Sequence, residues 1–190
     1  MELGWIILAG VVVVSYLWYI TIIKRRNNVQ EALSGIDVQL QQRADLLPNL
    51  IAIAKRFLAH ESDVFAQVTA LRTHAQQPYD RSKPDQVKSH FAAADALGRS
   101  MGGLMVQMEA YPELKSDALM LQTQQSFNEV EAQLAASRRF YNASVNALNT
   151  AIQIFPGMLF AKLAGAQKMP SFIAEPAARG TVDAGALFRS

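Results

Sequence analysis

The chain has 190 residues, a formal net charge of +2 at pH 7 and no cysteine. This length suits one folded domain together with a short additional segment such as an anchor. A charge so close to balance argues against a nucleic-acid partner, and the lack of cysteine excludes disulfides, thiolate metal sites and cysteine nucleophiles.

The first feature along the chain is an apolar run without charged residues, from Leu3 to Ile23. About 20 such residues, each rising ~1.5 Å in a helix, cross a hydrocarbon core of ~30 Å. We therefore predict a transmembrane helix over residues 3–23, with the lipid bilayer as its partner. A basic triplet at 24–26 follows the run, whereas a cleaved signal peptide carries its charges before a shorter apolar stretch. By the positive-inside rule, the triplet predicts an outside N-terminus and a cytoplasmic domain.

The segments after the anchor have helical periodicity, because their apolar residues recur every three, four or seven positions. Four sets stand out: Val29, Leu33, Ile36, Leu40 and Leu47; Leu50, Ala54, Phe57, Val64, Val68 and Leu71; Ala94, Leu97, Met101, Leu104, Met108 and Tyr111; Phe127, Val130, Leu134, Tyr141, Val145, Leu148 and Ile152. Such stripes are typical of bundle seams. We predict an all-α fold, in which the transmembrane helix continues into a long antiparallel four-helix bundle over residues 24–164.

Local signals predict where the helices begin and end. Asp45 is suited to cap a second helix with Pro48 in its first turn, so the first helix is expected to end near Ala44. Residues 77–82 have the composition of a loop. The stretch at 165–190 is rich in proline, glycine and small residues, and we predict that it is largely disordered.

The end of the fourth helix is expected near the membrane, because antiparallel neighbours bring that helix back toward the anchor. An apolar segment with basic residues follows it. Its candidate membrane-surface residues are Phe155, Met158, Leu159, Phe160, Lys162 and Leu163. Apolar side chains next to lysines suit the boundary between headgroups and acyl chains. The alternative is that the same residues close the open end of the bundle as ordinary core.

Three segments have a distinctive order and spacing. The first runs from Ile36 to Leu50 (IDVQLQQRADLLPNL) and is followed by His60-Glu61; the second runs from Glu109 to Lys115 (EAYPELK); the third runs from Arg138 to Asn146 (RRFYNASVN) and leads to Asn149-Thr150 and Phe155-Pro156-Gly157. Together they resemble the LemA family over roughly residues 25 to 164. The chain departs from that pattern at 169–172, where the family more often continues with an aromatic pair and an acidic residue.

The resemblance implies a bacterial protein of the cytoplasmic (inner) membrane, with one N-terminal span and a long antiparallel helical bundle. LemA proteins have no established biochemical activity, and one branch of the family is linked to magnetosome formation. The resemblance therefore implies a fold and a place in the cell, but no reaction and no cofactor.

Seven polar residues are candidates for binding a protein partner that the sequence does not identify: Arg43, Asp45, Arg138, Arg139, Asn142, Asn146 and Asn149. The first two are expected at the turn between the first two helices, where a cap and a salt bridge are the alternative to a binding surface. The arginine pair suits a phosphate or an acidic partner, or simply a solvated face. The asparagines share one helix face and form either a hydrogen-bonding seam, inside the bundle or against another chain, or a plain wet face.

The sequence has no arrangement typical of catalysis or of a metal site. The three histidines His60, His74 and His90 lie on different segments, and His60-Glu61 lacks the second histidine of a zinc-protease helix. We therefore expect no metal, no cofactor and a non-enzymatic interaction or scaffold protein, for which a homo-oligomer is compatible. One alternative is an enzyme or enzyme subunit that uses Arg43, Asp45, Arg138 and Tyr141 in a charged cleft. Another is a protein that transmits a signal along its first helix.

Overall fold

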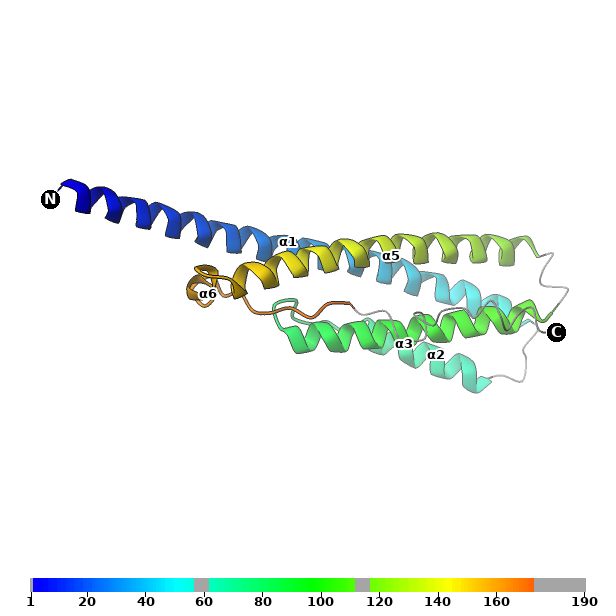
Figure 1. Cartoon of the computed structure of the whole chain (residues 1–190). Helices are drawn as coiled ribbons and strands as arrows, with labels where there is room; N and C mark the ends of the chain where they lie inside the picture. Colours follow the sequence, from blue (N-terminus) through cyan, green and yellow to red (C-terminus); the bar gives the residue numbers. More distant parts are fainter. Residues whose placement is uncertain (1, 57–61, 112–116, 173–190) are drawn as a thin grey trace, which may run out of the picture.

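The computed structural model describes residues 2–56, 62–111 and 117–172. The helices in these ranges are α1 (Glu2–Ala54), α2 (Ser62–Ala75), α3 (Pro84–Glu109), α5 (Ala118–Gln153) and the short α6 (Gly157–Phe160). No strand occurs in the described part of the chain, and the four long helices pack side by side (Figure 1). The predicted all-α fold, with an N-terminal apolar helix leading into a helical bundle, is confirmed.

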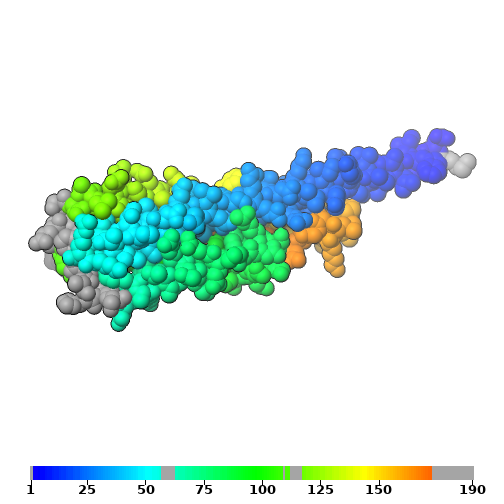
Figure 2. Space-filling view, turned by 180° about the vertical axis from the view of Figure 1, so that it is seen from behind, coloured from blue at the N-terminus to red at the C-terminus, as the bar shows by residue number. Residues whose placement is uncertain are grey.

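Helix α1 combines two kinds of surface. Its N-terminal part contains a window of mean hydropathy 2.4 that is only 6% buried, and by length and composition it is the one described helix suited to cross a membrane. From Ile22 onward, one face of α1 is buried against the other helices. Figure 2 shows the dark blue N-terminal stretch projecting beyond the bundle. The apolar segment and the first helix of the bundle are therefore one continuous rod.

The predicted end of the first helix near Ala44 is wrong. Helix α1 continues through Pro48 to Ala54, and Leu47, Leu50 and Ile53 extend its buried stripe with at most 1% exposure each. Proline inside a helix costs ~3 kcal/mol, whereas burying each large aliphatic side chain contributes about 1.5–3 kcal/mol. Packing of the stripe therefore outweighs the local helix-breaking signal.

Asp45 is not a helix cap, because it lies within α1, nine residues before the end of that helix, on its exposed face. Its Oδ1 accepts a hydrogen bond from Gln41 Nε2 at 2.8 Å and lies 3.7 Å from Arg72 Nη2. An exposed pair of this kind contributes little to stability. A first-turn proline and a side-chain cap do mark the start of α3 and of α5, later in the chain. Asp117 accepts hydrogen bonds from the first turn of α5, and α3 begins at Pro84.

The helices alternate in direction as predicted. α1 leads away from the apolar end, α2 returns, α3 leads away again and α5 returns (Figure 1). Buried side chains form two clusters along the bundle. The distal cluster includes Leu47, Leu50, Ile53, Val68, Leu97, Met101, Leu104 and Met108. The cluster nearer the apolar end includes Val29, Leu33, Ile36, Phe91, Leu134, Tyr141, Val145 and Leu148.

The C-terminal segment is partly packed. Residues 165–172 run back along the bundle, and the side chains of Met169 and Phe172 are each 6% exposed within the second cluster. This part of the tail therefore differs from the disordered segment that its composition predicts. Residues 173–190 lie outside the described ranges, as do Phe57 and His60, so the predictions for them stay predictions.

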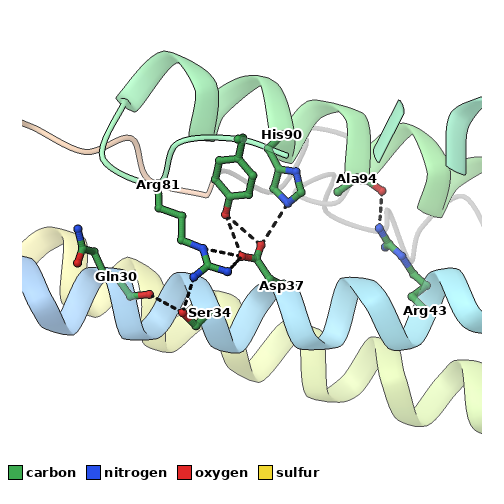
Figure 3. Close-up of polar contacts among 8 residues, drawn as sticks. Gln30, Ser34, Asp37, Arg43, Arg81, His90 and Ala94 are labelled. Carbon is green, nitrogen blue, oxygen red and sulfur yellow. Dashed lines mark hydrogen bonds and ion pairs between the residues drawn. The ribbon is translucent and has the colours of Figure 1, made fainter. Parts of the chain in front are cut away.

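Arg43 connects α1 to two other helices. Its side chain is 2% exposed, its Nη2 donates a hydrogen bond to the carbonyl of Ala94 in α3 (Figure 3), and its Nη1 donates to Glu131 Oε1 in α5 at 3.1 Å. A buried charge that loses its partner typically costs about 3–5 kcal/mol. Arg43 is therefore an internal connection among three helices, and not a surface charge at a turn.

Gly98 provides a test of this connection. A methyl group at Gly98 would lie 2.5 Å from Arg43 Nη1 and 3.0 Å from its Cζ. We predict that Gly98→Ala destabilises the full chain in detergent by about 1–3 kcal/mol, because the guanidinium must leave buried partners. That loss exceeds the gain of about 0.5–1 kcal/mol that alanine brings to a helix interior. The measurement is the denaturant midpoint of unfolding.

Gly103 on the same helix is the matched control, because a methyl group there would meet no atom within 4 Å. Gly103→Ala should stabilise the chain by about 0.5–1 kcal/mol. If both substitutions raised the midpoint equally, the close packing of Gly98 against Arg43 would be refuted.

Candidate functional site

A polar cluster lies where the loop between α2 and α3 crosses α1. Asp37 comes from α1, Tyr79 and Arg81 come from the loop, and His90 comes from α3 (Figure 3). The four residues are brought together from three separate segments, since residue 37 is 42 positions from Tyr79 in the chain. We call them the Asp37 cluster.

The carboxylate of Asp37 is the centre of the cluster. Tyr79 donates its hydroxyl hydrogen bond to Oδ1 and Oδ2 at 3.0 and 3.2 Å, and Arg81 donates from Nε to Oδ2 at 2.9 Å. His90 Nε2 lies 3.3 Å from Oδ1, and the His90 ring stacks on Tyr79 with centroids 4.1 Å apart. Arg81 Nη1 also donates to the Ser34 hydroxyl at 3.0 Å. Every member therefore contacts at least one other segment.

The electrostatics favour an ionised Asp37, a neutral Tyr79 and a charged Arg81 near neutral pH. Burial by itself raises the pKa of Asp37, but the polar contacts with His90, Tyr79 and Arg81 outweigh it and leave that pKa below its ordinary value of 3.8. Burial and the neighbouring Asp37 charge both raise the pKa of Tyr79, so its phenol stays protonated. For Arg81, burial lowers the pKa, but the hydrogen bond and the charge of Asp37 raise it above the ordinary value. An ionised Asp37–Arg81 pair with a neutral phenol is suited to fasten the loop to α1.

A cleft of about 480 Å³ opens beside the cluster, and Asp37, Gln41, Arg43, Tyr79, His90 and Leu97 are among its lining residues. Its charged groups are engaged with each other or with the protein. Asp37 pairs with Arg81, and Arg43 binds Glu131 and the backbone. The residues that the structure describes include no group of three or more His, Asp, Glu or Cys side chains able to hold a metal ion.

The four residues of the predicted charged cleft do not converge. Arg43 lines the cleft, but Asp45 lies on the exposed face of α1 beside Arg72. Arg138 Nη2 binds Asp95 Oδ1 at 2.9 Å, and its guanidinium lies 4.1 Å from the ring centre of Phe172. Tyr141 is fully buried and donates to the carbonyl of Pro170 at 2.7 Å. Arg139, next to Arg138, is exposed.

Two of the three asparagines bind the chain's own C-terminal segment. Asn142 accepts a hydrogen bond from Phe172 N at 2.7 Å and donates to Phe172 O at 2.9 Å. Asn149 does the same to Met169, at 3.0 Å from N and 2.9 Å to O. Asn146 is exposed and faces a groove between α1 and α5. Of the predicted seam, Asn142 and Asn149 thus bind within the chain. Each side-chain amide satisfies the backbone N–H and C=O of one residue in the C-terminal segment.

The candidate membrane-surface residues follow α5 at the end of the bundle from which the apolar part of α1 emerges. Phe155, Met158, Leu159 and Leu163 are between 55% and 76% exposed. Lys162 is also exposed, and Phe160 is half-buried. These apolar side chains do not belong to either core cluster, so the ordinary-core alternative does not describe them.

The Asp37 cluster was not predicted from the sequence, although two of its members gave some signal there. Asp37 borders the buried stripe of α1 directly after Ile36, and a half-buried acidic residue there needs a partner. The partner lies in a loop of irregular structure, however, where periodicity gives no signal. His90 stood out only as one of three scattered histidines.

Acidification tests the cluster. We predict that Asp37→Asn destabilises the chain by about 1–3 kcal/mol near pH 5, because two donors lose a charged acceptor. The pKa of Asp37 is lower in the folded chain than in the unfolded chain. Its contribution is therefore complete above the unfolded value of about 3.9 and is lost as the pH falls through the folded value. The difference between wild type and variant in unfolding free energy should shrink below about pH 4.

Asp45→Asn is the matched control, since the Asp45 side chain is 56% exposed against 19% for Asp37. It should cost less than about 1 kcal/mol. Equal effects at both positions would contradict a stabilising role for the cluster.

Comparison with known proteins gives relatives of similar sequence. The chain is 24% identical over 179 residues to magnetosome protein MamQ 2 of Paramagnetospirillum magneticum, covering 84% of this chain and 66% of that protein. It is 23% identical to magnetosome protein MamQ of Magnetospirillum gryphiswaldense, covering 90% of this chain and 73% of the relative. Protein LemA of Metamycoplasma hominis is 25% identical over 135 residues, covering 70% of this chain and 59% of that protein. The chain thus spans about two thirds of the length of MamQ 2.

The family model described as LemA family matches residues 32–184. The match includes most of the bundle, with the Asp37 cluster, Arg43 and the asparagines that bind the C-terminal segment. The N-terminal apolar helix precedes the matched region and indicates membrane association. From the extent of this match, the chain belongs to the LemA family.

Proposed function

We propose that this LemA-family protein is a membrane-anchored, non-enzymatic scaffold. Residues 3–23 span the bacterial cytoplasmic membrane, with the N-terminus outside, and hold the bundle at the cytoplasmic surface. There the bundle binds a protein partner, without a cofactor and without nucleic acid.

The observation that carries this proposal is the continuity of α1. One helix of 53 residues contains both the apolar segment and a large share of both core clusters. A helix resists bending because bending breaks its ladder of backbone hydrogen bonds. The bundle is thereby held at a set distance and orientation from its anchor, which is the property that a scaffold needs.

The placement of the charged residues also supports a scaffold. Arg43, Arg138 and the Asp37 cluster bind other parts of the chain, and Tyr141 fastens the C-terminal segment. An enzyme in the same fold would need groups free to bind and transform a substrate. If the protein had an enzymatic activity, the cleft beside the Asp37 cluster would be its candidate site.

The outer face shared by α1 and α5 is the proposed partner surface. A groove of about 440 Å³ is lined there by Glu31, Ala32, Gly35, Ala136, Ser137 and Phe140. Phe140 is 58% exposed and its neighbour Arg139 is also exposed. Aromatic residues, including phenylalanine, and arginine are enriched in protein interfaces relative to the rest of the surface. Among the seven candidate residues, Arg139 is thus better suited to a partner than the buried Arg43.

A second candidate function is signal transmission, and the same continuity of α1 favours it. A displacement or rotation of the membrane segment would be passed to Arg43 and, through its hydrogen bonds, to α3 and α5. A scaffold needs only a rigid α1, whereas a signal transmitter needs α1 to occupy two different positions relative to the other helices.

Cysteine labelling tests the orientation. The chain contains no cysteine, so Ser82→Cys in the exposed loop near the membrane end gives a single reactive thiol. We predict that a membrane-impermeant thiol reagent does not label it in intact cells and labels it fully after permeabilisation. Ready labelling in intact cells would place the bundle outside.

Photocrosslinking in cells tests the partner surface. A photoreactive amino acid at Phe140 of the full chain is predicted to give an adduct of defined mass. The same probe at exposed Gln125, on the same helix, is the control and should give no such adduct. An adduct with the mass of two copies would identify a homo-oligomer. The absence of a defined adduct at Phe140 would contradict a partner on this face.

A further inference from the structure

The segment after α5 is docked on the part of α1 that enters the membrane. A methyl group at Gly157 would lie 3.6 Å from the ring of Trp18, and Ile22 in the same region of α1 is fully buried. Arg26 Nη1 donates a hydrogen bond to the carbonyl of Ala164 at 3.1 Å. In Figure 2 the orange residues lie directly below the point where α1 leaves the bundle.

The position along α1 sets the depth of this segment. Trp18 precedes Lys24, the first charged residue after the apolar run, by six positions, or about 9 Å along a helix. Interfacial helices bury their apolar face about 5–10 Å into the boundary between headgroups and acyl chains. If the membrane begins near Lys24, the segment that packs on Trp18 lies within this boundary.

The outward face of the segment is apolar. Phe155 is 76% exposed, Leu163 73% and Leu159 60%, and none of them packs in a core cluster of the bundle. Exposed apolar patches that adjoin one another mark surfaces that are covered in the functional state. The exposed Lys162 and Lys168 border this face and suit anionic headgroups.

The groove between α1 and α5 at the same level has a matching change in polarity. Along α1 it is lined first by Trp18, then by Thr21, then by Arg25. Along α5, which runs the other way, it is lined by Ile154, then Thr150, then Asn146. Both helices therefore change from apolar to polar in the same direction, away from the apolar end. A boundary between lipid and water at this level satisfies both helices at once.

We propose that residues 154–163 form a second membrane element, which lies in the cytoplasmic interface of the bilayer and is docked against the transmembrane part of α1. Phe155, Leu159 and Leu163 contact the acyl chains, and Lys162 faces the headgroups. The occupant of this apolar face is thus the lipid bilayer that surrounds the span. This inference rests on the anchorage proposed above and adds to it a contact that fixes how the bundle is seated on the membrane.

Spin labels in the full chain test the proposal. Because the chain has no cysteine, Leu159→Cys, Leu163→Cys, Val13→Cys and Val106→Cys each give one nitroxide after labelling. Val13 lies in the span, whereas Val106 is an equally apolar residue, 68% exposed, near the distal end of α3. The chain is reconstituted in vesicles of phosphatidylcholine and phosphatidylglycerol. Collision with oxygen, which concentrates in lipid, is compared with collision with a water-soluble nickel chelate.

The proposal expects the ratio of oxygen to nickel accessibility at Leu159 and Leu163 to exceed that at Val106 several-fold, approaching that at Val13. A water-like ratio at Leu159 with a lipid-like ratio at Val13 would overturn the second membrane element while leaving the anchor in place. Water-like ratios at both would overturn the anchorage itself. Spectral broadening at Leu159 that disappears on dilution with unlabelled chain would show that a second copy covers the face, which also overturns the proposal.

Discussion

The structure depends on one constraint, which is that a single helix, α1, has two different kinds of surface along its length. Over its first part, apolar side chains point outward in all directions, as lipid requires, and from Ile22 onward only one stripe is apolar and buried. The other helices are arranged around this change. α5 and α6 end at the level where α1 loses its all-round apolar surface, and the loop that contains Tyr79 and Arg81 is fastened to α1 by Asp37. The half of the bundle nearer the apolar end therefore contains both the Asp37 cluster and the contacts of the C-terminal segment with α5.

Polar contacts in this bundle position helices that apolar packing alone would allow to slide. Rows of leucine and methionine fit together in several registers, whereas a buried guanidinium fits in one. Arg43 fixes α1 against Ala94 and Glu131, and Arg138 fixes α5 against Asp95. The two arginines come from different motifs of the chain and lie in neighbouring layers of the bundle. Arg43 is buried and Arg138 is half-buried, so two arginines that the sequence suggested for binding a partner are used inside the fold.

The helices and their directions could be predicted from the sequence, because apolar periodicity reports which face of each helix is buried. The prediction failed at Asp45 and Pro48, where a capping residue and a first-turn proline indicated the start of a second helix, and the burial of Leu50 and Ile53 decided the outcome. The Asp37 cluster escaped prediction because its contacts join a helix to an irregular loop. The asparagine face was recognised, but its partner was not, since the composition of residues 165–172 resembles that of a disordered tail.

The two asparagine contacts also match a spacing on helix α5 to a spacing in the C-terminal segment. Asn142 and Asn149 are seven residues apart on a helix, a distance of about 10.5 Å. Their targets, Phe172 and Met169, are three residues apart in an extended segment, a distance of about 10 Å. The length of two helical turns thus nearly equals the length of three extended residues. Both amides reach their targets only when the two segments lie in this alignment. An added or missing residue between Met169 and Phe172 would leave one amide without its target, so the spacing itself fixes the direction and the position of the C-terminal segment along α5 up to Phe172.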